Sequence, residues 1–237
     1  MLKVFFLQNH LPMNTLGNKF NIFWIGLIFS LACSRTAPEP IEFSISQGVL
    51  NNMDFTSLGI QTGQHLPEIL YYTLTGEKFE IEANTTKLLI SGSYTCDITR
   101  GNLQAIDWLY MKYKDEVDIY LVNTLEAHPH NSHSPYSMNE EPWLVKENIA
   151  SAIAAEQPTT IEERIDLAEK WIKESGIQAP LILDGPKNGF WNLVGQAPNM
   201  AILVSTDGEV LLKQSWFEME EMEEAIDIQL QQMKADK

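Results

Sequence analysis

Cys96 is a nucleophilic side chain at a place where a strand is expected to give way to a helix. "TKLLI" before it is a short apolar run suited to a central strand, and residues 101–115 after it have helical spacing. A helix N-terminus stabilises a thiolate, which is the nucleophilic form of cysteine. Arg100, one helical turn on, adds positive potential, whereas the adjacent Asp97 opposes it. The small polar neighbours are not typical of core, so a nucleophilic Cys96 is preferred to a buried structural cysteine, while the pKa of its thiol is left open.

A second group of candidate side chains follows the next predicted strand. Residues 117–124, "VDIYLVNT", are typical of a buried strand, and Glu126 and His128 come directly after it. Histidine titrates in the range useful for moving the proton of a thiol, and Glu126 is placed to orient or tune it. His130 and His133 share this loop with His128, and the three side chains are of the metal-binding type. Because the loop offers no rigid scaffold for ligands, redox chemistry is preferred and no metal site is predicted.

The elements around these residues follow an order that indicates a fold class. They are a β-hairpin at 69–83, a strand at 86–91, the helix at 101–115, the strand at 117–124, a helix at 159–176, a strand at 179–185, a short helix at 188–196, a hairpin at 199–214 and a helix at 216–234. A parallel βαβ half followed by an antiparallel ββα half resembles the thioredoxin-like fold. The extra strand and helix at 180–196 are what the peroxiredoxin branch of that fold carries. Pro198, just before a strand, matches a proline that in such folds is cis and packs against the active-site thiol.

Two of the predicted helices have clear internal patterns. The helix at 159–176 opens at Thr159 or Thr160 with Glu163 in the capping-box position. The apolar face of the 101–115 helix consists of Leu103, Ile106, Trp108, Leu109, Tyr110 and Tyr113. The buried stripe of the last helix consists of Met219, Met222, Ile226, Leu230 and Met233. These methionines are interpreted as core and not as a metal site.

The N-terminal third contains a targeting signal by its pattern. An apolar stretch at 20–32 follows Lys19 and ends at Cys33, which is too short for a comfortable membrane span but suits a signal peptide. "SLAC" resembles a bacterial lipoprotein signal, in which the cysteine becomes lipid-modified. We therefore predict a signal peptide at 1–33 with Cys33 as the lipidation site, a tether and irregular lead-in at 34–66, and a thioredoxin-like domain at 67–237. Translation is expected to start at Met13 in preference to Met1; an uncleaved signal anchor is the alternative.

Composition limits the partners of this chain. The 237 residues carry a formal net charge of −16, with a pI of about 4.6. Such a surface repels phosphate, so neither nucleic-acid binding nor a basic membrane patch is expected. Membrane attachment through the N-terminal lipid places the folded part in the bacterial cell envelope, facing the periplasm or exterior. Ser34 after the lipid site favours the outer membrane, because an inner-membrane retention aspartate is absent. The oligomeric state is left open, and a dimer is compatible with the sequence.

Two stretches in register resemble the iodothyronine deiodinase family and its bacterial relatives. "LLISGSYTCDITR" is similar to the family's strand-to-helix turn, and "IYLVNTLEAHPHNSHSPY" to the motif after its next strand. The likeness extends from about Ile69 to the end of the chain. The matched positions are Ser93, Thr95, Cys96, Glu126, Ala127, His128 and Pro198, with Cys96 in the position of the family's selenocysteine.

The resemblance implies a role for each matched side chain. Cys96 is then the nucleophile, His128 with Glu126 the acid/base pair, and Pro198 the wall of the pocket, while Ser93 and Thr95 supply hydrogen bonds. Other family residues are replaced here: its two further cysteines fall at Tyr94 and Ala179, an acidic residue at Asn199 and a histidine at Pro158.

A redox protein with one active cysteine needs an external reductant. If Cys33 carries lipid, Cys96 is the only free thiol, and no disulfide can form within the chain. We expect a thiol oxidoreductase that reduces a small molecule, a halogenated aromatic or a hydroperoxide, with an external thiol or a thioredoxin-like reductant and no cofactor. Two alternatives remain: thiol–disulfide exchange, although no C-x-x-C motif is present, and a non-catalytic thioredoxin-fold binding lipoprotein.

Overall fold

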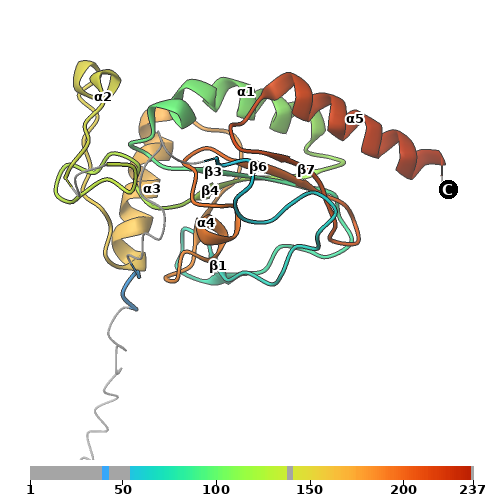
Figure 1. The fold of residues 1–237 in the computed structure, drawn as a ribbon, viewed down its shortest axis with the longest axis horizontal. Coiled ribbons are helices and arrows are strands. Elements are labelled where there is room, and N and C mark those ends of the chain that lie inside the picture. The colour runs from blue at the N-terminus through green and yellow to red at the C-terminus, as the bar shows by residue number, and fades with distance from the viewer. Residues whose placement is uncertain (1–38, 43–53, 138–140, 236–237) are drawn as a thin grey trace, which may run out of the picture. The chain divides into compact units, whose positions relative to one another are not determined.

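The computed structural model describes residues 39–42, 54–137 and 141–235 (Figure 1). The chain divides into two units, residues 1–36 and 37–237, and the whole of the first lies outside the described residues. The predicted signal peptide at 1–33 and lipidation of Cys33 therefore stay predictions. Within the described part of the second unit, no helix has the length and apolarity needed to cross a membrane.

A mixed β-sheet forms the centre of the second unit (Figure 1). Its strand order in the described residues is β2-β1-β5-β4-β3-β6-β7. The bounds are β1 Tyr71–Tyr72, β2 Lys78–Phe79, β3 Lys87–Gly92, β4 Asp118–Asn123, β5 Leu181–Asp184, β6 Ala201–Val204 and β7 Val210–Gln214. Strands β3, β4 and β5 run parallel, and the strands on either side pair antiparallel to them. The carboxyl ends of β3 and β4 thus meet at one edge, where the candidate site lies.

The helices cover the sheet unequally. Their bounds are α1 Asp97–Tyr113, α2 Lys146–Ala150, α3 Ile161–Ser175, α4 Gly189–Leu193 and α5 Met219–Ala235. The larger apolar cluster joins α1, α3 and α5 to one face of the sheet through residues such as Ile106, Trp171 and Ile226. A second cluster on the other face contains Phe190 of α4 and Phe55 of the lead-in. Figure 1 shows α1 and α5 together on one side and α4 on the other.

The predicted element order is confirmed. Both hairpins form, and β5 with α4 supplies the extra strand and short helix expected at 180–196. Helix α3 is capped by Thr160, whose side chain accepts from the Glu163 N–H at 3.3 Å, while the Glu163 carboxylate accepts from the Thr159 N–H at 2.7 Å.

Three details differ from the sequence-based expectation. Helix α1 begins at Asp97, four residues earlier than its apolar spacing indicated, because Cys96 acts as its N-cap. The side chain of Trp108, predicted on the apolar face, is 44% exposed. Helix α2 forms before the helix predicted at 159–176, in a stretch for which no element was predicted. In the last helix, Met222 is buried as predicted, and its neighbours on the stripe are buried or half-buried.

The described lead-in residues lie against the domain. Ile41 donates its backbone N–H to the Thr159 carbonyl at 2.8 Å, and Phe55 and Ile60 are buried in the second cluster. His65 forms an isolated antiparallel bridge with Glu209. These contacts tie parts of the lead-in to the sheet.

Candidate active site

The Cys96 sulfur caps the N-terminus of α1. After β3 ends at Gly92, a short turn closes when the Cys96 N–H donates to the Ser93 carbonyl at 3.2 Å. The backbone N–H of Thr99 then donates to the Cys96 sulfur at 3.4 Å. Gly92 lets helix and strand approach this closely, because a Cβ there would lie 2.6 Å from the Thr99 Cγ2. The thiol therefore lies at a helix N-terminus, where the sequence predicted it.

Burial works against ionisation of this thiol. Cys96 is 1% exposed, and burial is the main reason that its pKa is raised to about 11. Hydrogen bonding from Thr99 lowers the pKa, while the nearby Asp97 carboxylate raises it further. The neutral thiol is therefore the favoured form in the resting protein at pH 7. The sequence indicated an accessible thiol, because the residues next to Cys96 are small and polar. In the structure, residues distant in sequence bury the thiol.

Glu126 holds the turn that carries the thiol. Its carboxylate accepts from the Thr95 N–H at 2.7 Å, the Thr95 hydroxyl at 2.6 Å and the Tyr94 N–H at 3.3 Å. The side chain is fully buried, and this burial raises the pKa of Glu126. The sequence-based expectation paired Glu126 with His128, but the structure places its carboxylate in the 94–95 turn.

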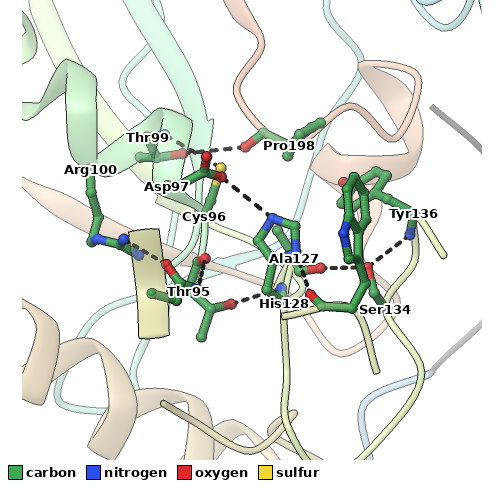
Figure 2. Close-up of polar contacts among 12 residues, drawn as sticks. Thr95, Cys96, Asp97, Thr99, Arg100, Ala127, His128, Ser134, Tyr136 and Pro198 are labelled. Carbon is green, nitrogen blue, oxygen red and sulfur yellow. Dashed lines mark hydrogen bonds and ion pairs between the residues drawn. The ribbon is translucent and has the colours of Figure 1, made fainter. Parts of the chain in front are cut away.

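Ser93 and Thr95 link this turn to the loop after β4. The Ser93 hydroxyl accepts from the Ala127 N–H at 3.1 Å, and the Thr95 hydroxyl accepts from the His128 N–H at 3.0 Å. Both side chains are buried. The two motifs that are far apart in sequence thus form one hydrogen-bonded unit, and Figure 2 shows its contact between Thr95 and His128.

His128 is oriented by two oxygen atoms. Its Nδ1 lies 2.8 Å from the Trp143 carbonyl, and since a carbonyl only accepts, Nδ1 carries a proton. Its Nε2 lies 3.4 Å from the Asp97 carboxylate, so the neutral ring presents Nε2 as a proton acceptor beside an anion. Burial lowers the pKa of His128, although the Trp143 carbonyl and Asp97 both oppose this. Figure 2 shows the ring turned toward Asp97 and the start of α1.

Arg100 connects the turn before Cys96 to helix α2 by hydrogen bonds. Its guanidinium donates to the Tyr94 carbonyl at 3.2 Å and to the Asn148 side-chain oxygen at 2.6 Å. The Asn148 amide in turn donates to the Thr95 carbonyl at 2.8 Å. Arg100 therefore contacts the backbone around the thiol, where the sequence indicated a contribution to positive potential.

Pro198 and Tyr136 lie on the other side of the site. The buried Pro198 accepts from the Thr99 hydroxyl through its carbonyl at 3.5 Å. Tyr136 packs in one apolar cluster with Cys96 and Ala127, and its hydroxyl donates to the Gln196 carbonyl at 2.8 Å. A further cover comes from segment 141–151, in which the Trp143 ring meets the His128 ring edge-on with centroids 5.1 Å apart.

The sequence-based reasoning missed several of these contacts. Asp97 was considered only as a neighbour that disfavours the thiolate, and its reach to His128 depends on the helix starting at residue 97. Tyr136, Trp143 and Asn148 lie between β4 and α3, where the sequence has no periodic signal, so their positions depend on tertiary packing. Among the described residues, no three His, Cys, Asp or Glu side chains are grouped to hold a metal ion. His130 directs its Nδ1 to the Ala155 carbonyl at 2.8 Å.

Comparison with known proteins supports the fold. No family model matches the chain, and no curated protein matches it significantly. A candidate protein disulfide isomerase from Bacteroides thetaiotaomicron is 15% identical, with 73% of this chain and 91% of that chain covered at a TM-score of 0.50. The thioredoxin domain of a thiol-disulfide oxidoreductase from Bacteroides vulgatus is 16% identical (70% and 97% covered, TM-score 0.46). StoA from Bacillus subtilis is also 16% identical (69% and 99% covered, TM-score 0.45).

At these identities the likeness concerns the fold and not the activity. The first of the three structures reaches a TM-score of 0.50 over 73% of this chain. The chain has a thioredoxin-like fold, with a cysteine at the N-terminus of the helix that follows β3.

Proposed function

We propose that this protein is a thiol oxidoreductase in which Cys96 is the nucleophile and His128 accepts its proton. The observation that carries the proposal is that the Cys96 sulfur caps helix α1 while the free nitrogen of His128 faces Asp97, the first residue of the same helix. A proton that arrives on Nε2 is stabilised by the Asp97 carboxylate, while Nδ1 stays hydrogen-bonded to the Trp143 carbonyl. The neutral ring favoured by burial is the form that accepts a proton.

Chemistry at this site is a two-electron reduction of a small molecule. With a hydroperoxide, the thiolate sulfur attacks the terminal oxygen, the O–O bond breaks, and the products are a cysteine sulfenate and an alcohol. With an iodinated aromatic, the sulfur takes the iodine as a sulfenyl iodide, and the ring carbon receives a proton. One external thiol then displaces water from the sulfenic acid, or iodide from the sulfenyl iodide, and forms a mixed disulfide with Cys96. A second external thiol attacks this mixed disulfide, which frees the Cys96 thiol and leaves the two reductant molecules joined as their disulfide.

An external reductant follows from the cysteine content of the fold. Within the described residues Cys96 is the free cysteine, and it is buried. The positions after it are Asp97, Ile98 and Thr99, so an internal C-x-x-C exchange is not available. Both features favour a deiodinase-like or peroxidase-like cycle over disulfide exchange. We further propose that the protein is attached to the cell envelope through lipid on Cys33, as the 20–33 sequence suggests.

A specific observation favours a second function, a binding protein without redox chemistry. The sulfur is 1% exposed and its pKa is raised to about 11, which is typical of an inert buried cysteine. For the enzyme to act, the residues packed against the sulfur, such as Tyr136, have to move so that substrate reaches it.

Turnover of two substrates separates these functions. The assay supplies hydrogen peroxide or 4-iodophenol with excess dithiothreitol, and compares the wild-type protein with Cys96→Ser and His128→Gln. The enzyme reading predicts turnover of one substrate that Cys96→Ser abolishes and His128→Gln slows about 10²-fold, as expected for loss of a general base. Absence of turnover with both substrates, or equal turnover in Cys96→Ser, would leave the binding function.

A further inference from the structure

A cavity of about 700 Å³ lies under the N-terminal hairpin, away from Cys96. Its wall combines the 66–71 segment, the hairpin around β2, the start of β3 and the 206–208 turn. β3 begins at Lys87 and ends at Gly92, so the cavity is near the opposite end of the strand from the thiol. The volume is in the range of small-molecule sites in proteins.

One charged side chain of this wall is buried. Lys87 is 6% exposed, and it shares a face of β3 with Leu89, because side chains alternate along a strand. Across the described ranges of the chain, no hydrogen bond or ion pair is formed by its ammonium group. Asp118, its neighbour in the β3–β4 ladder, attracts the charge, but the carboxylate accepts from the Thr85 hydroxyl at 2.6 Å. Burial lowers the pKa of Lys87.

The ammonium group of Lys87 has little exposure to water and no hydrogen-bond partner among the described residues, but its nitrogen is not fully enclosed, so it can reach an anionic ligand that enters the cavity. The other charged groups on the cavity wall, which are Glu68, Lys78, Glu80 and Asp207, are all exposed at its rim. Half-buried apolar side chains flank the interior: Leu66, Ile69, Phe79 and Ile81. The interior thus offers one positive charge and an apolar surround.

We propose that this cavity binds a small organic anion with an apolar body, the anionic group contacting Lys87. The apolar part packs against Phe79 and its aliphatic neighbours, and the carboxylate or sulfonate accepts hydrogen bonds from the Lys87 ammonium group. The rim carboxylates of Glu68 and Glu80 disfavour ligands with charge at both ends, so a single anionic head with an uncharged tail fits best. This site is separate from the redox chemistry and does not depend on it.

The test is calorimetric titration of the purified protein with 2-naphthoate and with its neutral counterpart 2-naphthamide. The proposal predicts saturable binding of 2-naphthoate at one site and much weaker binding of the amide. Lys87→Gln weakens 2-naphthoate binding about tenfold or more and leaves the amide unchanged, as expected for loss of a charge-assisted hydrogen bond. Lys78→Gln is the matched control, because it removes a lysine from the same cavity at its exposed rim, and it retains binding.

A folding control keeps the result interpretable. Lys87→Met replaces a buried, unpaired charge by an apolar chain of similar length, so this variant is expected to melt at or above the wild-type temperature and to lose 2-naphthoate binding. Equal binding of acid and amide, undiminished binding in Lys87→Met, or absence of 2-naphthoate binding to the wild-type protein would each overturn the proposal. Because turnover at Cys96 is not involved, failure here leaves the proposed redox function unaffected.

Discussion

Replacement of Glu126 by glutamine tests whether this carboxylate acts as the structural support of the thiol turn. Three donors meet the carboxylate, two of them from Thr95 and one from the Tyr94 backbone. A glutamine side chain keeps one acceptor oxygen and places an NH₂ group against backbone N–H donors, so at least one contact becomes repulsive. Hydrogen bonds to a charged group contribute about 1.5–3 kcal/mol each.

The expected cost follows from these contacts. Both Thr95 donors meet the same oxygen, which the glutamine carbonyl can replace, so these two hydrogen bonds change from charged to neutral at about 1 kcal/mol each. Loss of the Tyr94 hydrogen bond removes about 1.5–3 kcal/mol more. Relief of a buried charge offsets part of this, because burial disfavours the ionised carboxylate, which leaves a net loss of about 2–4 kcal/mol in the free energy of unfolding. Urea unfolding at pH 7 measures this quantity.

Glu163→Gln is a matched control on the surface. The Glu163 carboxylate also accepts from the N–H and hydroxyl of one threonine, Thr159, at 2.7 and 2.8 Å, but it is exposed. Its replacement is expected to cost less than about 1 kcal/mol. If Glu126→Gln were as stable as this control, the carboxylate would not be the support of the turn. The acid/base role with His128 that the sequence predicts for Glu126 would then be the better explanation.

Two further predictions concern the packing and the pH response. Asp184 is fully buried, and burial raises its pKa to about 6. Because the folded protein then holds the proton more tightly than the unfolded chain, protonation of Asp184 stabilises the fold at low pH. This contribution to the free energy of unfolding is lost as the pH rises through about 6. Between about pH 4 and pH 7 the unfolding free energy of the wild type should therefore fall by about 3 kcal/mol relative to Asp184→Asn, and parallel curves would contradict this. Gly92→Ala puts a methyl group 2.6 Å from the Thr99 side chain, so this variant should have a lower melting temperature than the wild type. Gly101→Ala has open space around its Cβ and should stabilise α1 by about 1 kcal/mol, which raises the melting temperature. Equal melting temperatures of the two variants would refute the packing argument.

The sequence predicted the fold well because its strands and helices have regular patterns. Apolar runs such as 181–184 and the Asp207-Gly208 turn indicate their strands locally, and the order of elements then restricts the topology. The thiol's place between β3 and α1 could be predicted for the same reason.

The environment of the thiol could not be predicted from local patterns. Which groups face His128 depends on the exact start of α1 and on the carbonyl of Trp143, fifteen residues away in an aperiodic loop. Burial of Cys96 likewise depends on residues distant in sequence, Ala127 and Tyr136, which form one apolar cluster with it. The cavity at Lys87 had no sequence signal, because a lysine at the start of a strand is normally solvated.

The most direct test of the central claim is the pH dependence of Cys96 alkylation in the folded protein. Iodoacetamide reaction, followed at the Cys96 peptide by mass spectrometry, is compared in the wild type and in His128→Gln from about pH 5 to pH 10. If His128 accepts the thiol proton, the wild-type rate rises as the pH passes the pKa of His128, which burial holds below its ordinary value of about 6.5. At pH 7 the wild-type rate then exceeds the rate of the variant about tenfold or more. Superimposable profiles, or no reaction at Cys96 while the protein stays folded, would contradict the proposed chemistry.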